Sequence, residues 1–298
     1  MVADKLMNDS DLNSFMWLDR LNKLGPIGFS MFLFAVLLTM INWMLEILKW
    51  KTLAGDVAPI SLMQATRQSL SSLTASLLTP NRIGEYGAKA IYFSRVERPR
   101  IIMLNFLGNA YQMMSTLIFG VIGLLSLGKL LSLPSSGLTW ILAAAMLVAL
   151  VMIFIIVFQK KWSTCFRRIQ VIFSKIPYQI HRETFLYSML RYLIFSHQFY
   201  LFLVFFGVDT PYELAMPLIF VMYFISSVIP GFVIFDWLVK GSVALTIFHF
   251  FDVNDIVILC ITASMWMLNF AIPSIIGSFY VFTFKSRRFV FSESKQKG

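Results

Sequence analysis

The stretch T-P-N-R-I-G-E-Y-G-A-K-A at residues 79–90 decides the fold, because a second stretch repeats its plan. Residues 229–243 read I-P-G-F-V-I-F-D-W-L-V-K-G-S-V. Each stretch has a proline, then an acid (Glu85 or Asp236), then a lysine four residues after the acid. Charges inside weakly polar or apolar runs are costly and usually mark a pathway for a substrate or an ion. Two such copies in two halves of a chain are typical of transporters built from repeats.

The composition places the chain among membrane proteins. Of its 298 residues, 58% are hydrophobic and 13% are charged, and its mean hydropathy is +0.75. A soluble domain averages about 25% charged residues. The net charge of +10 would also suit a nucleic-acid partner, but the basic residues cluster beside apolar runs. That clustering is the positive-inside pattern, which concerns orientation in a membrane, so we expect no nucleic-acid partner.

The first 26 residues lack the compact apolar core and cleavage site of a secretory signal.

The chain offers little material for catalysis. Cys165 falls in a basic loop and Cys260 in a predicted span, so we expect neither a disulfide nor a metal site. Residues 123–129 spell G-x-x-x-x-G-K, but no Ser or Thr follows, as a phosphate-binding loop requires. We therefore predict no cofactor, no metal and no catalytic residue.

The apolar runs predict an all-α integral membrane protein, a single domain over 1–298, with about five full transmembrane helices. Uncharged runs of roughly 20 residues are long enough to cross a bilayer. The predicted spans are 27–48, 101–127, 138–158, 184–206 and 255–284. Loop 159–183 has six basic residues and one acid, which predicts a cytoplasmic loop, an external N-terminus and a cytoplasmic C-terminus.

Two further segments are too short or too polar for ordinary crossings. Segment 58–96 has a Ser/Thr-rich helix, a break at Pro80 and Gly84, and a short return to a basic cluster. It is expected to be a re-entrant hairpin that enters from the cytoplasm. Segment 212–254 is broken at Pro230 and has acids but no Lys or Arg at its ends, so it is expected to enter from outside.

These segments form two units of opposite orientation. Residues 27–127 read span, cytoplasmic hairpin, span, and residues 184–284 read span, external hairpin, span. The span at 138–158 connects the units and reverses the second one. This order predicts an inverted repeat with both broken tips near the membrane midplane. The alternative, in which each hairpin is an ordinary pair of spans with polar ends, stays open.

Charged residues inside these runs are the candidate substrate-binding groups. They are Arg67, Arg82, Glu85, Lys89, Arg191, Asp236 and Lys240. The acid–lysine pairs at i,i+4 can meet on one helix face, and in the simpler interpretation they only neutralise each other. Five cations against two carboxylates would suit an anionic group such as phosphate, which arginine binds with two parallel hydrogen bonds.

Other polar residues in the spans are expected to hold helices together. His197 is expected to make a hydrogen bond between helices rather than carry protons. Asn42 is expected to do the same, and its replacement by Ala to leave lipid binding unchanged. Glu46 precedes Lys49 by one turn and is expected at the membrane interface.

The segment T-P-N-R-I-G-E-Y-G-A-K-A, after a Ser/Thr-rich helix, resembles the membrane region of the lysylphosphatidylglycerol synthase/flippase family. The later I-P-G-x-x-x-x-D looks like the second, proline-led motif of that family. The resemblance covers residues 27–284 and implies an integral inner-membrane protein of a kind often described as a lipid flippase. The residues that it matches are Pro80, Arg82, Gly84, Glu85, Pro230 and Asp236.

The chain departs from the family pattern in three respects. No soluble aminoacyl-transferase domain follows residue 284, so lysyl transfer to lipid is not expected. The second motif is usually rich in glycine and carries a glutamate, whereas here residues 232–235 are bulky and the acid is Asp236. The family commonly has another span before the first one here, which residues 1–26 do not supply.

Together these features predict translocation of an anionic lipid, or of a lipid-linked intermediate, between the leaflets of the inner membrane. One alternative is an intramembrane transferase that uses Glu85 or Asp236 as general base. Another is a non-transporting membrane partner of a biosynthetic enzyme. Homo-oligomerisation is also left open.

Overall fold

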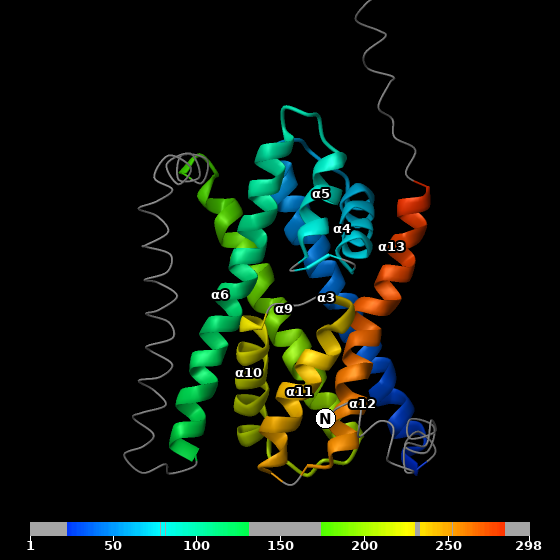
Figure 1. Ribbon diagram of the computed structural model, residues 1–298, viewed down its shortest axis with the longest axis vertical. Helices are drawn as coiled ribbons and strands as arrows, with labels where there is room; N and C mark the ends of the chain where they lie inside the picture. The colour runs from blue at the N-terminus through cyan, green and yellow to red at the C-terminus, as the bar shows by residue number, and fades with distance from the viewer. Residues whose placement is uncertain are drawn as a thin grey trace, which may run out of the picture.

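The computed structural model describes residues 23–77, 79–80, 82–130, 174–229, 233–251 and 253–283, which form an all-helical bundle (Figure 1). Four of its helical rods are long and apolar enough to cross a membrane: α3 (Pro26–Gly55), α6 (Arg98–Leu130), α9 (Tyr178–Phe205) and the continuous rod Asp255–Phe282. The predicted all-α membrane fold is therefore confirmed. These four rods coincide with four of the five predicted spans, and the fifth, 138–158, lies outside the described residues.

Helix α3 is longer than the predicted span 27–48. It begins at Pro26, where the fixed φ of proline favours the first helical turn, and it continues through Lys49 and Trp50 to Gly55. These two side chains are 3% and 1% exposed. The helix therefore extends beyond the predicted end of the span at residue 48, and its packing on α9 buries Lys49 beside Glu46.

The first predicted hairpin consists of two short helices. Helix α4 (Leu62–Leu77) begins with a reciprocal cap, in which Ser61 N donates to Gln64 Oε1 and Gln64 N donates to Ser61 Oγ. Helix α5 (Ile83–Ile91) follows. Their 16 and 9 residues span roughly 24 and 14 Å, which is less than the ~30 Å of bilayer hydrocarbon.

The turn between α4 and α5 brings the two helices into close contact. A Cβ atom at Gly84 would lie 2.2 Å from the carbonyl oxygen of Ala75, so only glycine fits there. Thr79 supports the turn, because its Oγ1 accepts a hydrogen bond from Gly84 N at 2.9 Å. Arg82, directly before α5, has the left-handed backbone conformation with φ 60°, which is uncommon for a residue with a side chain.

The second predicted hairpin likewise consists of two short helices. Helix α10 (Tyr212–Val228) has 17 residues, the short 3₁₀ turn η1 (Val233–Phe235) follows, and α11 (Asp236–His249) has 14 residues. Figure 1 shows α4 and α5 in the upper half of the bundle and α10 and α11 in the lower half. The breaks of the two pairs meet at mid-height, where η1 contacts α4. Pro230 lies outside the described residues.

The rod Asp255–Phe282 has an irregular centre. It consists of α12 (Asp255–Trp266), a π turn η2 (Met267–Ala271) and α13 (Ile272–Phe282). Its α13 part packs against α4, and a Cβ atom at Gly277 would lie 2.1 Å from the carbonyl oxygen of Leu70. Helix α6 packs against α10 in a similar way, with Gly120 and Gly123 at the contact.

The bundle has two apolar cores. One is formed by buried residues of α9, α10, α11 and α12, and the other by residues of α3, α4, α5 and α6. Most of the Ser and Thr side chains of α4 face protein, as predicted: Ser71 bonds the Tyr92 hydroxyl, and Thr74 donates to the carbonyl oxygen of Ser274. The Ser and Thr side chains of α4 therefore help to hold it against its protein neighbours.

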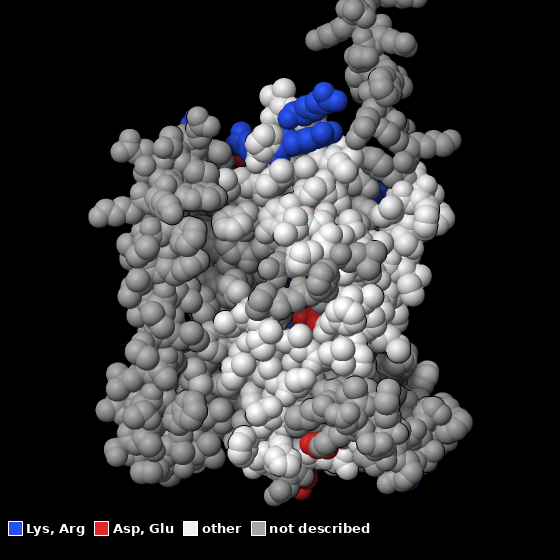
Figure 2. Space-filling model, viewed as in Figure 1, with Lys and Arg blue, Asp and Glu red and all other residues white. Residues whose placement is uncertain are grey.

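The two ends of the bundle differ in charge. Figure 2 shows basic side chains at the end formed by the α5–α6 connection, acidic side chains at the opposite end, and a largely uncharged belt between them. Exposed residues at the basic end are Lys51, Arg95, Arg100, Lys175 and Arg182. Exposed acids at the opposite end are Asp209 and Glu213. The predicted orientation, with the basic end in the cytoplasm, rests on this asymmetry and remains a prediction.

Candidate functional site

A cavity of about 200 Å³ lies where the two helix breaks meet. For comparison, one water molecule takes up about 30 Å³ of the liquid. The main polar and charged residues that line the cavity are Asn42, Glu46, Arg82, Gln112, Arg191, Asp236, Lys240 and Asn269. Its aromatic lining residues are Trp43, Phe195, Phe199, Tyr223, Trp237, Trp266 and Phe270. The cavity therefore combines charged groups with apolar walls.

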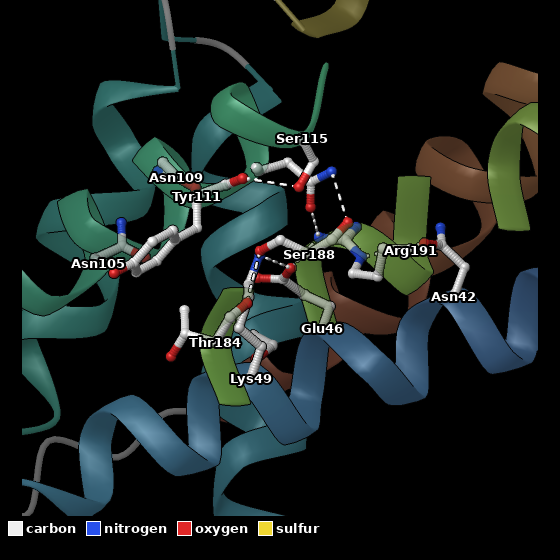
Figure 3. Close-up of polar contacts among 12 residues, drawn as sticks. Asn42, Glu46, Lys49, Asn105, Asn109, Tyr111, Ser115, Thr184, Ser188 and Arg191 are labelled. Carbon is white, nitrogen blue, oxygen red and sulfur yellow. Dashed lines mark hydrogen bonds and ion pairs between the residues drawn. The ribbon is translucent and has the colours of Figure 1, made fainter. Parts of the chain in front are cut away.

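Glu46 is the centre of a buried ion-pair network. Its carboxylate contacts Arg191 Nη1, lies 2.7 Å from Lys49 Nζ and lies 3.9 Å from Lys89 Nζ. Figure 3 shows Glu46 and Lys49 on α3 and Arg191 on α9 pointing toward one another. Glu46, which was expected at the membrane interface, is buried inside the bundle at 8% exposure, because α3 packs on α9 and continues beyond it.

Arg191 is held by polar side chains as well as by Glu46. Its Nε donates to Asn42 Oδ1 at 3.1 Å, and Asn42 Nδ2 donates to Asn269 Oδ1 at 3.0 Å. Asn269 Nδ2 in turn donates to Gln198 Oε1 at 2.9 Å. Asn42 was expected to be neutral for lipid binding, but it lines the cavity and orients Arg191, so it belongs to the candidate site.

The pair Glu85–Lys89 lies behind the cavity rather than in it. Lys89 Nζ donates to Glu85 Oε1 at 2.8 Å and to Asn105 Oδ1 at 2.8 Å. It also lies 4.3 Å from the centre of the Trp50 ring, a favourable cation–π distance. Both charged side chains are only 2–3% exposed. This pair has no direct access to a substrate in this structure.

Arg82 connects that buried pair to the cavity. Its Nε lies 3.2 Å from Glu85 Oε2, but the geometry does not make a hydrogen bond. Neither of these two atoms has a hydrogen-bond partner among the described residues. The Arg82 side chain is 41% exposed, whereas that of Glu85 is 3% exposed. Arg82 therefore presents a guanidinium to the cavity while Glu85 compensates its charge from behind.

The pair Asp236–Lys240 is the accessible counterpart in the second half. Lys240 Nζ donates to Asp236 Oδ2 at 2.6 Å, and the side chains are 27% and 32% exposed. The lysine also lies 5.7 Å from the Tyr223 ring centre and 5.4 Å from that of Phe270. Both charges line the cavity, so a ligand can reach them.

Arg67 lies outside the cavity lining, although we expected it to reach the same cavity. Its side chain is exposed on the part of α4 that faces α13, and its guanidinium carbon lies 6.0 Å from the Tyr280 ring centre. His197 bonds the Tyr212 hydroxyl through Nε2 at 2.9 Å, which is the expected contact between helices. Within the described ranges, no three His, Cys, Asp or Glu side chains are placed to hold a metal ion.

Four of the seven predicted site residues therefore line one cavity: Arg82, Arg191, Asp236 and Lys240. Glu85 and Lys89 stand behind it, and Arg67 does not join them. The sequence interpretation missed Glu46 and Lys49. Their i,i+3 spacing at the end of a long apolar run was a usable signal, because such a pair can meet on one helix face.

A bundle of apolar helices that encloses a charged, aromatic-walled cavity between two broken helix pairs is a polytopic membrane protein. The chain belongs to the lysylphosphatidylglycerol synthase transmembrane-region family, whose model matches residues 15–277. The resemblance of the chain to that family is therefore confirmed. No curated protein and no solved structure gives a significant match to the chain.

Proposed function

We propose that the protein is a lipid transporter of the inner membrane that moves an anionic lipid, or a lipid-linked intermediate, between the leaflets. The main support is the cavity, whose lining holds three cations (Arg82, Arg191 and Lys240) against two carboxylates (Glu46 and Asp236). Arginine at membrane depth is costly unless it is paired or meets a polar ligand. Membership in a membrane-lipid family supports the same reading.

The two helix pairs support the re-entrant, inverted-repeat architecture as part of this proposal. Each of α4, α5, α10 and α11 is shorter than the bilayer core. The contacts also correspond: α13 packs on α4 as α6 packs on α10, and α3 packs on α9. In a two-fold related pair, the last span of each unit would cover the broken helices of the other. Rocking one unit against the other would then open the cavity to alternate sides.

Each charged group has a role in this proposal. Arg82 and Arg191 bind the headgroup, while the acyl chains remain in the lipid. The Glu85–Lys89 pair holds the backbone of α5, and thereby Arg82, in place. The Asp236–Lys240 pair is exposed enough to exchange, so Lys240 pairs with Asp236 in one state and with the ligand in the other.

The transferase alternative is less well supported at Glu85. A general base must come within hydrogen-bonding reach of the proton that it removes. Glu85 is 2% exposed and already faces Lys89 and Arg82. Appearance of a new lipid product when the purified protein is incubated with a radiolabelled lipid would favour the transferase instead.

A matched pair of arginine substitutions tests the transport proposal. Arg82 lines the cavity, whereas Arg67 lies on an exposed part of a neighbouring helix. In proteoliposomes with a fluorescent anionic lipid, R82Q should slow translocation by roughly tenfold or more, because a hydrogen bond to a charged group contributes about 1.5–3 kcal/mol. R67Q should translocate at the wild-type rate. Wild-type translocation by a correctly folded R82Q protein would contradict the headgroup role.

A further inference from the structure

The charges in and directly behind the cavity do not balance. The cluster contains five cations, which are Lys49, Arg82, Lys89, Arg191 and Lys240. It contains three carboxylates, which are Glu46, Glu85 and Asp236. The cluster therefore carries two positive charges more than its own acids neutralise.

The contacts of each carboxylate show where the excess lies. Among the described residues, Glu46 contacts three cations, Glu85 contacts two, and Asp236 pairs with Lys240 alone. Lys89 is shared between Glu46 and Glu85. The excess is therefore in the group around Glu46 and Glu85, which includes the two arginines that line the cavity.

No further acid in the described segments is available to balance this cluster from within. The remaining acids lie at the helix ends, where Asp56, Glu97 and Glu183 are at the basic end and Asp209, Glu213 and Asp255 at the opposite end. Asp56 already pairs with Arg100 at 2.7 Å. The sequence of residues 131–173 contains no Asp or Glu. No acid of the described segments therefore supplies the compensating charge, which a bound anionic ligand can supply.

We propose that the headgroup held in this cavity is a dianion of the phosphomonoester type, a terminal phosphate, rather than a singly charged phosphodiester. This inference rests on the proposed function and specifies its substrate class. Unbalanced charge at membrane depth is costly, so a ligand that cancels both excess charges is favoured over one that cancels only one. A phosphomonoester has about −1.5 to −2 charges at pH 7 and three strong acceptor oxygens.

The geometry of the cavity matches those three oxygens. Arg82, Arg191 and Lys240 reach the cavity from three elements: the start of α5, α9 and α11. Arg82 Nε is without a hydrogen-bond partner among the described residues, although it is shielded from solvent. Guanidinium groups bind phosphate oxygens with paired hydrogen bonds. A phosphodiester has two of its oxygens blocked by ester bonds, so its two free oxygens are too few to give each of these three cations an oxygen of its own.

A binding comparison between two phospholipids tests this inference. The purified protein in phosphatidylcholine nanodiscs is titrated with phosphatidic acid, a phosphomonoester, and with phosphatidylglycerol, a phosphodiester. Phosphatidic acid should bind at least about tenfold more tightly, because the second charge acts in a partly buried site where charges are weakly screened. R82Q should remove most of this preference. R100Q is the matched control, since Arg100 is an exposed arginine with its own acidic partner far from the cavity.

The possible results distinguish failure of the dianion inference from failure of the proposed transport function. Equal affinities for the two lipids would overturn the dianion inference while leaving anionic-lipid transport intact, and binding of neither lipid would overturn both. Equal loss in R82Q and R100Q would mean adsorption to the basic end and would also overturn the inference. Glycerol 3-phosphate is the third ligand and is tested as a competitor of phosphatidic acid. Weak competition supports a lipid headgroup as the bound group. Competition as strong as that of phosphatidic acid would support the dianion chemistry with a soluble phosphomonoester as its source.

Discussion

Arg191 of α9 is bound to Glu46 of α3, and the same carboxylate also holds Lys49 and approaches Lys89. One buried acid therefore compensates cations from three helices. E46Q should lower the free energy of unfolding by about 3–5 kcal/mol, because breaking a buried ion pair leaves its partners uncompensated. Thermal unfolding in detergent measures the change. E213Q, at an exposed acid of α10, is the control and should unfold like wild type.

The Asp236–Lys240 pair, by contrast, should affect ligand binding more than the stability of the fold. Both side chains are about a third exposed, so D236N should change the free energy of unfolding by only about 0–1 kcal/mol. The same change removes a negative charge from the cavity lining and frees Lys240 for the ligand. Affinity for an anionic lipid should therefore rise several-fold in D236N, measured by lipid titration. Weaker binding than wild type would show that Asp236 does not compete with the ligand; D209N is the control at an exposed acid.

Two glycines of one short helix provide a matched test of the α4–α5 turn. A Cβ atom at Gly84 would lie 2.2 Å from the Ala75 carbonyl oxygen, whereas one at Gly87 would meet no atom within 4 Å. G84A should therefore destabilise the protein by about 1–3 kcal/mol through overpacking. G87A should be neutral or slightly stabilising, since alanine favours helix. Equal melting temperatures for the two variants would mean that the close approach of α4 and α5 is not required.

The orientation in the membrane can be tested with single cysteines. In a background with Cys165 and Cys260 replaced by serine, a cysteine at Ser94 lies at the basic end and one at Thr210 at the opposite end. An impermeant thiol reagent added to intact cells should label position 210 and leave position 94 unlabelled until the membrane is opened. Labelling of position 94 from outside would reverse the predicted orientation.

The sequence was sufficient for the long helices and for four of the charged residues that line the cavity, which are Arg82, Arg191, Asp236 and Lys240. Long apolar runs predicted α3, α6, α9 and the rod Asp255–Phe282 to within a few residues at most of their ends. The exceptions are the C-terminal end of α3 and the N-terminal end of α9, which both extend further toward the basic end of the bundle. The repeated acid–lysine spacing gave the two i,i+4 pairs. Both signals are local, so they can be read from one stretch of chain.

The errors arose where long-range packing decides the outcome. Arg67 and Arg82 both belong to the first predicted hairpin, but whether each reaches the cavity depends on how α4 meets α13 and how α5 begins. The burial of Glu46 depends on α9, which lies about 140 residues later in the chain. The different exposures of the two acid–lysine pairs likewise result from their neighbours and not from their own spacing.

The π turn at Met267–Ala271 sets the phase of the helix that follows it. An α-helix turns by about 100° per residue, so the extra residue of a π turn rotates everything after it relative to a regular helix. Asn269 in this turn faces Asn42 and Gln198, while Gly277 beyond it faces Leu70 of α4. If the same residues formed a regular α-helix instead, Gly277 would be rotated by about 100° and would point away from α4. The irregular turn thus allows one rod to present its polar residues to α3 and α9 and its small residue to α4.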